Sequence, residues 1–289
     1  MALETPPRTA YSQVVFLFSS PCSTAQITYS NDAARPNRWH PWTHGIESVS
    51  ALRKSVSVCL ASRNGELYIE AQILSILEQL QPQDELIVSD DASTDHTIAL
   101  VKKLADCRIR ILQNTHPLGV IKNFEKALVC AEYDYIFLCD QDDIWLPGKI
   151  DRCLKVLEYA VLVVTDCQVV DTQLHPIHAS FFSLRGSRSG MISNLWKNSY
   201  LGCCIALRRQ VLQRALPIPL GVPMHDMWLG LIAQTYGQVV FLPEILSLYR
   251  RHPEATSDAA GFSRASLIQQ FGYRFRLLQA LVCRLVFKQ

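Results

Sequence analysis

Short apolar runs alternate with helix-like segments between residues 55 and 143, and this alternation restricts the fold more than any other feature. The runs that predict strands are residues 56–60, 85–88, 109–111 and 135–139. Apolar residues spaced three and four apart predict the intervening helices, at residues 69–80, 98–104 and 121–128. Strands joined through helices pair in parallel. The sequence therefore predicts an α/β fold with a mainly parallel sheet and helices on both faces.

The remainder of the chain is less regular. It predicts helices at residues 150–157 and 224–233, and strands at residues 161–165, 200–207, 238–242 and 245–249. We expect one domain over residues 53–258, followed by a separate C-terminal helix over residues 259–289. Residues 1–52 combine several prolines with serine, threonine and asparagine and show no sustained periodicity, which predicts a poorly ordered leader or an extension.

The composition excludes several classes of protein. At 49% hydrophobic and 19% charged residues, the chain has enough apolar material for a large core. The net charge of +2 gives no whole-protein reason to expect binding to nucleic acid. No apolar run approaches the roughly 18 residues of a membrane-spanning helix. Ten cysteines without a C-x-x-C pair predict a reduced, cytoplasmic chain.

Polar clusters follow three of the predicted strands, at residues 62–65, 90–95 and 140–143. In open parallel sheets, ligands bind outside the carboxyl ends of the strands. We therefore expect these three clusters to meet at one rim of the sheet and to form a binding site there.

The densest of these clusters is Asp140-Gln141-Asp142-Asp143. Three carboxylates in four residues repel one another at a buried strand end unless a cation neutralises them. Their oxygen atoms suit Mg²⁺ or Mn²⁺, ions that commonly bridge to diphosphate oxygens. The alternative interpretation is a solvated acidic turn that caps the helix beginning near Pro147.

Two further clusters have both a chemical and a structural interpretation. A carboxylate within residues 90–95 suits a hydrogen bond to a nucleobase or ribose, whereas Ser93 or Thr94 suits the cap of the next helix. The pair His225-Asp226 precedes an aromatic residue. Asp226 is a candidate general base for a sugar hydroxyl, and a helix cap is the structural alternative.

Seven motifs in order give the chain a resemblance to family 2 glycosyltransferases of the GT-A fold, and within them to rhamnosyltransferase-like members. The resemblance covers about residues 55–255. The motifs are Ala61-Ser62-Arg63-Asn64-Gly65, Asp90-Asp91-Ala92-Ser93-Thr94-Asp95, the stretch from Asn114 through Gly119 to Asn123, Asp140-Gln141-Asp142-Asp143-Ile144-Trp145, Asn198-Ser199-Tyr200-Leu201-Gly202-Cys203, His225-Asp226-Met227-Trp228 and Tyr249-Arg250-Arg251-His252.

The resemblance implies inverting transfer of a sugar, with rhamnose as one candidate, from a dTDP- or UDP-linked donor to a glycan or lipid-linked acceptor. It implies Mg²⁺ or Mn²⁺ held by Asp142 and His252, and Asp226 as the catalytic base. The donor side that it implies is Ala61, Arg63, Asn64, Asp90, Asp91, Gly119, Lys122, Asn123, Asp140 and Gln141. The acceptor side is Asp143, Trp145, Gly202, Cys203, His225 and Trp228. The alternative function is a catalytically degenerate nucleotide-sugar-binding partner in a glycan-synthesis complex.

Residues 271–289 predict a basic amphipathic helix. Its apolar positions are Phe271, Phe275, Leu278, Leu281, Val282 and Leu285, and its cations are Arg274, Arg276, Arg284 and Lys288. One interpretation is peripheral contact with the inner face of the plasma membrane, and the other is packing of the helix on its own domain.

Overall fold

The computed structural model describes residues 53–252 and 267–287, which belong to one compact unit. The predicted leader over residues 1–52 and the predicted junction at residues 258 and 259 lie outside the described residues. Among the helices of the described ranges, none combines the length and the apolar character needed to cross a membrane.

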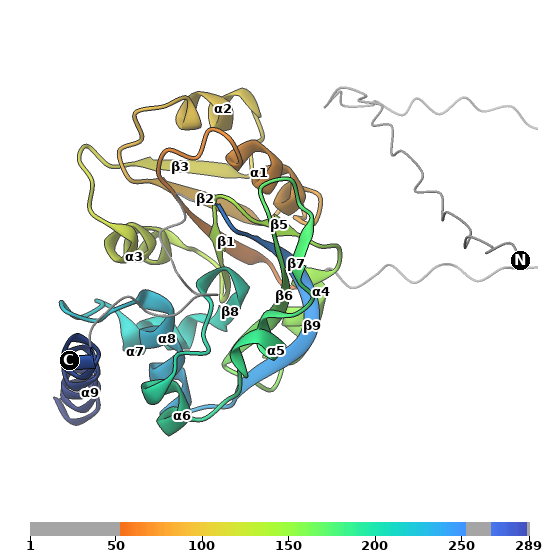
Figure 1. Cartoon of the computed structure of the whole chain (residues 1–289). Helices are drawn as coiled ribbons and strands as arrows, with labels where there is room; N and C mark the ends of the chain where they lie inside the picture. The colour runs from red at the N-terminus through yellow and green to blue at the C-terminus, as the bar shows by residue number, and fades with distance from the viewer. Residues whose placement is uncertain (1–52, 253–266, 288–289) are drawn as a thin grey trace, which may run out of the picture. The chain divides into compact units, whose positions relative to one another are not determined.

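A mixed sheet with the strand order β3-β2-β1-β4-β8-β6-β9-β5 forms the centre of the domain, and β7 pairs with β6 at one side (Figure 1). The strands are β1 (Val56–Ser62), β2 (Glu85–Asp90), β3 (Ile109–Gln113), β4 (Tyr135–Asp140), β5 (Ile144–Trp145), β6 (Leu162–Val170), β7 (Pro176–His178), β8 (Ile205–Arg208) and β9 (Val239–Arg250). The first four strands pair in parallel, as the alternation of strands and helices predicts.

Helices cover both faces of the sheet. They are α1 (Ile69–Leu77), α2 (Thr97–Lys103), α3 (Val120–Cys130), α4 (Lys149–Leu157), α5 (Phe181–Arg185), α6 (Met191–Trp196), α7 (Arg209–Ala215), α8 (His225–Gln234) and α9 (Leu267–Phe287). Side chains of β1 alternate between two cores, because successive residues of a strand point to opposite faces. Cys59 lies in the core under α3 and α8, whereas Val58 and Leu60 lie in the core under α1 and α4.

The predicted strand over residues 200–207 is only partly correct. Gly202–Cys204 forms a 3₁₀ turn, and the strand β8 begins at Ile205. Tyr200, Cys203 and Cys204 are at most 3% exposed. The apolar run therefore reflects burial of a turn, which periodicity alone cannot distinguish from a buried strand.

The two strands predicted over residues 238–242 and 245–249 are one continuous strand, β9. The register against β6 shifts between Leu242, which lies opposite Thr165, and Ile245, which lies opposite Asp166. Pro243 falls in this bulge, where its missing N–H breaks no ladder hydrogen bond. The prediction of two separate strands is therefore wrong, because the bulge lets the strand continue through Pro243.

Two helical glycines give a matched test of the packing. A Cβ on Gly230 of α8 would lie 2.3 Å from the buried ring of Tyr200, whereas a Cβ on Gly272 of α9 would meet nothing within 4 Å. We expect Gly230→Ala to lower the free energy of unfolding by about 1–3 kcal/mol through overpacking. Gly272→Ala should raise it by up to about 1 kcal/mol through helix propensity. Urea unfolding of both variants measures this, and equal effects would contradict the packing described.

Candidate functional site

The three predicted polar clusters meet at the carboxyl-end rim of the parallel strands. β1 lies between β2 and β4, and its last residue, Ser62, is in register with Asp90 of β2. On the other side, Ala61 of β1 is in register with Asp140 of β4. The loops that follow these three strands therefore start side by side.

The first two loops of the rim are hydrogen-bonded to each other. The N–H of Asn64 donates to Ser93 Oγ at 2.9 Å, and the N–H of Thr94 donates to Asn64 Oδ1 at 2.9 Å. Asn64 has a φ of 49°, in the left-handed region that asparagine tolerates better than most residues. The expectation that Ser93 or Thr94 caps the next helix is wrong, because both serve this loop and α2 begins only at Thr97.

Asp90 and Asn123 are buried and bonded within the protein. Asp90 accepts from Ser62 Oγ at 3.1 Å and from the N–H of Ser93 at 2.9 Å. Asn123 donates to the carbonyl of Ser89 at 2.7 Å and accepts from its hydroxyl at 2.7 Å. Both side chains connect the loops of the rim. Their predicted contact with a nucleotide-sugar donor stays a prediction.

Asp91 ties the rim to the loop before α3. It accepts from the N–H groups of Leu118 and Gly119 at 2.7 and 2.9 Å, and from Asn114 Nδ2 at 2.9 Å. Burial alone would raise the pKa of Asp91, but these hydrogen bonds and the charge of Arg63 lower it below its usual value. The Asp91 carboxylate is therefore ionised at neutral pH.

Gly119 and Lys122 lie at the start of α3. Gly119 has a φ of 84°, a conformation that side-chain-bearing residues rarely adopt. Lys122 pairs with Glu125 at 2.9 Å, and Glu125 also accepts from the N–H of Ile218. A contact between Lys122 and a nucleotide-sugar donor would therefore compete with this ion pair.

Gln141 fastens the third loop of the rim to the first. Its Oε1 accepts from the N–H of Arg63 at 2.8 Å, and its Nε2 donates to the carbonyl of Arg63 at 3.0 Å. A Cβ on Gly65 would lie within 2.3 Å of Gln141 Oε1, so the absence of a side chain at residue 65 permits this contact.

Asp142 and His252, which are 110 residues apart in the chain, are in direct contact. His252 Nε2 lies 2.7 Å from Asp142 Oδ2, and the two side chains are 8% and 18% exposed. Tyr68 packs on His252 with the ring centroids 5.0 Å apart, and Arg250 donates from Nε to the carbonyl of Asp142 at 2.8 Å. The end of β9 thus brings the two predicted metal ligands together.

A second group of donor atoms lies deeper, where those of Asp140, Asp143 and Cys203 are within 4.8 Å of one another. Asp143 Oδ1 accepts from the N–H of Arg250 at 3.1 Å, and its buried Oδ2 has no hydrogen-bond partner among the described residues. Burial, with the charge of Asp142, raises the pKa of Asp143 well above its usual value. Burial and the charges of Asp142 and Asp226 raise the pKa of Asp140 to about 8. This crowding of acids creates a need for positive charge.

Lys149 supplies one positive charge from inside the protein. It is 0% exposed, its Nζ donates to the carbonyl of Cys203 at 2.9 Å, and it lies 4.7 Å from the centroid of the Trp145 ring. Burial raises the pKa of Asp140, and the charge of Lys149 opposes that rise. Lys149 was not among the residues expected at the site. The sequence does contain one indication of its position. Lys149 precedes the apolar position Cys153 by four residues, a spacing that places both side chains on the buried face of α4.

Asp226 lies in the first turn of α8 and is 5% exposed. Burial raises its pKa to about 6, although the Met227 N–H, the Asn198 side chain and the Gly202 N–H donate to it and oppose the rise. Asp226 is also one of the charges that raise the pKa of Asp140, so the candidate base and the acidic rim share one electrostatic environment.

His225 is a neutral, buried neighbour of Asp226. Its ring stacks on Phe124 with the centroids 4.1 Å apart, and burial lowers its pKa to about 3. Neither ring nitrogen has a hydrogen-bond partner among the described residues. A Cβ on Gly202 would lie 3.0 Å from His225 Nε2, which explains the glycine there.

Trp145 and Trp228 were expected on the acceptor side, and the structure places both in the hydrophobic core instead. They are 2% and 0% exposed. Trp145 packs against Phe137, and Trp228 donates from Nε1 to the carbonyl of Ala215 at 2.8 Å. Cys203, also expected on that side, is 0% exposed. All three side chains are buried, and Cys203 lies beside Asp140 and Asp143.

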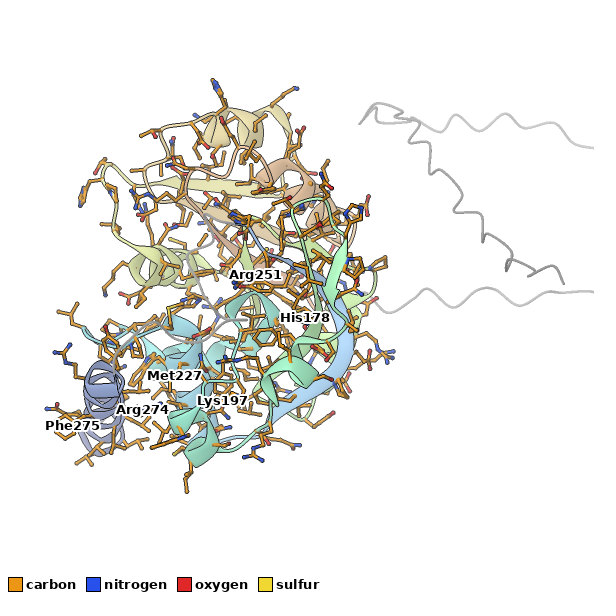
Figure 2. All side chains as sticks on the ribbon, in the orientation of Figure 1. His178, Lys197, Met227, Arg251, Arg274 and Phe275 are labelled. Atoms are coloured by element: carbon orange, nitrogen blue, oxygen red, sulfur yellow. The ribbon has the colours of Figure 1, made fainter. Side chains whose placement is uncertain are left out.

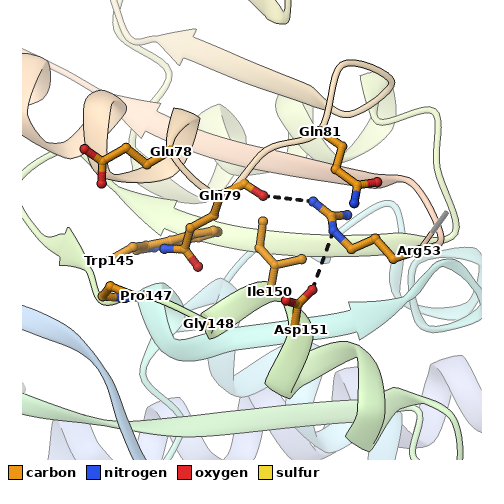
Figure 3. Close-up of a pocket in the computed structure, with 9 residues that line it drawn as sticks. All are labelled: Arg53, Glu78, Gln79, Gln81, Trp145, Pro147, Gly148, Ile150 and Asp151. Carbon is orange, nitrogen blue, oxygen red and sulfur yellow. Dashed lines mark hydrogen bonds and ion pairs between the residues drawn. The ribbon is translucent and has the colours of Figure 1, made fainter. Parts of the chain in front are cut away.

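A pocket of about 350 Å³ lies elsewhere, between the end of α1 and the start of α4 (Figure 3). Arg53, which precedes β1, donates to the carbonyl of Gln79 at 3.0 Å and lies 3.6 Å from Asp151 in this pocket. Trp145 is the one predicted site residue in its lining. The pocket therefore belongs to the amino end of the sheet and not to the rim.

Comparison with known proteins identifies several relatives that are named as glycosyltransferases. A family model described as "Glycosyl transferase family 2" matches residues 57–216. The chain is 26% identical over 216 residues to an Escherichia coli protein named UDP-Glc:alpha-D-GlcNAc-diphosphoundecaprenol beta-1,3-glucosyltransferase WfgD, covering 70% of this chain and 79% of that protein. It is 36% identical over 107 residues to the dTDP-rhamnosyl transferase RfbG of Shigella flexneri, covering 35% of this chain and 37% of that protein.

Solved structures share the fold at low sequence identity. Residues 1–349 of S. aureus TarS in complex with UDP-GlcNAc superpose with a TM-score of 0.62 at 17% identity, covering 79% of this chain and 66% of that chain. The mannosyltransferase PcManGT from Pyrobaculum calidifontis, in complex with GDP-Man and Mn²⁺, superposes with a TM-score of 0.56 at 21% identity, covering 81% and 70%.

Proposed function

Because the chain belongs to glycosyl transferase family 2 and has the GT-A fold, we propose that it transfers a sugar from a nucleotide-diphosphate donor with inversion at the anomeric carbon. The observation that supports this most is the contact of Asp142 with His252 at the rim, with Asp226 in the same electrostatic environment. One acidic group for a cation and one separate base are what such a transfer needs.

The residues at the rim fit a divalent cation. Asp142 and His252 offer oxygen and nitrogen donors 2.7 Å apart, a set that suits Mn²⁺ and, through the carboxylate, Mg²⁺. The deeper group of Asp140, Asp143 and Cys203 fits less well. A hydrogen bond with Cys204 and burial raise the pKa of Cys203 well above its usual value, so Cys203 stays a thiol. When bound, the cation would supply charge neutralisation for the departing diphosphate.

Asp226 is the proposed base. With a pKa of about 6 it is mostly ionised at neutral pH, yet it is more basic than an exposed aspartate. It takes the proton from the acceptor hydroxyl as that oxygen attacks the anomeric carbon. A single displacement inverts the configuration and requires no protein nucleophile. His225 cannot replace it as the base, because burial lowers its pKa to about 3 and its ring therefore binds a proton only weakly.

For the substrates, we propose a UDP- or dTDP-linked sugar and a lipid-linked glycan acceptor. Relatives named for each donor, and one named for a diphosphoundecaprenol acceptor, support this assignment. The nucleoside would lie over the loops of Arg63, Asp91 and Gly119, whose hydrogen bonds define the donor side of the rim. A lipid-linked acceptor would place the protein at the inner face of the plasma membrane.

The proposal is tested by incubating the protein with UDP- and dTDP-sugars, Mn²⁺ or Mg²⁺, and a GlcNAc-diphospholipid acceptor. We expect release of nucleoside diphosphate that requires both cation and acceptor, and a product whose anomeric configuration, by NMR, is opposite to that of the donor. Nucleotide binding without transfer from any donor would favour the alternative, a binding-only partner of a glycan-synthesis complex. Retention of configuration would contradict the mechanism.

A further inference from the structure

Positive charge is concentrated in one part of a chain that is nearly neutral overall. Residues 172–225 contain no aspartate or glutamate, and residues 267–287 contain none either. Together these two stretches carry nine cations, namely Arg185, Arg188, Lys197, Arg208, Arg209, Arg214, Arg274, Arg276 and Arg284. The net charge of the whole chain is only +2. The elements α5 to α7 and α9 therefore carry cations and no aspartate or glutamate, although Arg209 of α7 lies 3.7 Å from Asp134, which precedes β4.

Helix α9 has two apolar faces. Leu277 and Leu281 are 0% and 3% exposed and lie in the core with α8. A second set, Phe275, Leu278, Val282 and Leu285, is 48–69% exposed. At about 100° per residue, these four positions fall within an arc of roughly 80°. Packing on the domain thus accounts for one face only, and Figure 2 shows Phe275 directed away from the rest of the domain.

Helix α6 continues this exposed apolar area. Arg274 of α9 donates from Nη2 to the carbonyl of Trp196 at 2.8 Å, and its guanidinium lies 4.8 Å from the centroid of that indole ring. Trp196 is 65% exposed, and Ile192, one turn earlier, is 84% exposed. We define the α6–α9 surface by Ile192, Trp196, Phe275, Leu278, Val282 and Leu285.

We propose that the α6–α9 surface docks onto an anionic lipid bilayer, an inference that rests on the proposed lipid-linked acceptor. Exposed apolar side chains, an exposed indole ring and neighbouring arginines are the combination that binds a headgroup region. The charge complements anionic phospholipid, and the apolar face supplies the area that enters the acyl boundary. A neutral protein partner would explain the apolar residues but not the lack of aspartate and glutamate in α6 and in residues 267–287 of α9.

Docking in this way would orient the catalytic residues. α9 packs against α8, and α8 begins at His225-Asp226. A bilayer under α9 therefore lies beside the helix that carries the proposed base.

The experiment is co-sedimentation of the full chain with vesicles of phosphatidylglycerol and phosphatidylcholine, or of phosphatidylcholine alone. We expect binding to the anionic vesicles only. Phe275→Gln with Val282→Gln should weaken that binding at least about 10-fold, and Arg274→Gln, at the edge of the same arc, should weaken it by a smaller factor. The matched control replaces two exposed apolar residues elsewhere, Val129→Gln and Tyr159→Gln, which are 64% and 63% exposed. The control should bind as the wild type does.

Three results would overturn the proposal. The first is that the wild type does not bind anionic vesicles. The second is that the Phe275/Val282 variant binds them as well as the wild type does. The third is that the wild type forms a dimer in light scattering instead of binding vesicles, and that the variant loses this dimer. Turnover of a water-soluble acceptor, measured on the same variants, should be unchanged. If the wild type binds vesicles but transfers no sugar, the proposed function fails while the docking surface stands.

Discussion

Asp226→Asn is expected to lower the turnover number by about 10²–10⁴-fold, the contribution typical of a positioned general base. Asparagine keeps the shape of the side chain and an oxygen that can accept from the Met227 N–H, but it cannot take a proton at neutral pH. Nucleotide affinity should stay within about threefold of wild type if the base acts only in the displacement. Steady-state kinetics and calorimetric titration with the nucleotide measure the two effects.

The pH dependence provides a signature of the same residue. The base works in its ionised form, and burial raises its pKa to about 6. Turnover should therefore rise as the pH increases through about 6 and level off above about 7. The residual rate of Asp226→Asn should lack this step. A variant that retains a tenth of the wild-type rate, or the same step, would place the base elsewhere.

Stability should change in the opposite direction to activity. Because the folded pKa of Asp226 lies above the unfolded value of 3.8, the folded state binds more protons between these values, and stability falls as the pH rises through about 4 to 6. Removing the charge should stabilise the fold at neutral pH, by of the order of 1–3 kcal/mol. An inactive variant that unfolds more readily would instead indicate damage to the packing.

Asp142→Ala is expected to abolish the cation dependence of donor binding. Loss of a carboxylate ligand should weaken UDP binding in Mn²⁺ by about 100-fold or more, to the affinity measured without the metal. His252→Ala should weaken it less, by about tenfold, because the carboxylate remains. Calorimetric titration with UDP, with and without Mn²⁺, measures both variants.

Asp134→Ala is the matched control for Asp142→Ala. Asp134 precedes β4 at its amino end, with a side chain that is 83% exposed, whereas Asp142 follows the carboxyl end of the same strand. Its removal should leave UDP binding unchanged. If Asp142→Ala retains the effect of Mn²⁺, the deeper group of Asp140, Asp143 and Cys203 would be the better candidate for the cation.

Much of the fold could be predicted because the first half of the chain repeats one local pattern. Each apolar run from Val56 to Asp140 lies in a strand with helices packed on it, so the period of the sequence and the burial agree. The prediction failed where an apolar, buried segment is not an extended strand, or where a strand continues through a residue that usually ends one. The turn at Gly202–Cys204 is apolar but not extended, and β9 continues through Pro243 because a bulge accommodates it.

For the candidate site, the location of the residues at the rim could be predicted from the sequence better than the role of each side chain there. The carboxyl ends of parallel strands must lie side by side. Asp142 and His252, which the resemblance named together as metal ligands, are in contact. The direction of a side chain depends on tertiary packing, which spacing does not encode. Trp145 and Trp228 therefore point into the core, and Asn123 serves the rim itself.

The burial of Lys149 has a consequence for how the protein responds to ionic strength. Dissolved ions screen exposed charges beyond about 8 Å at physiological concentration, but they do not enter a close-packed interior. The acidic rim thus has a counter-charge that electrolyte cannot weaken. The arginines of α9, by contrast, face solvent along part of their length. Added electrolyte should therefore detach the protein from a charged bilayer while the chemistry at the rim continues.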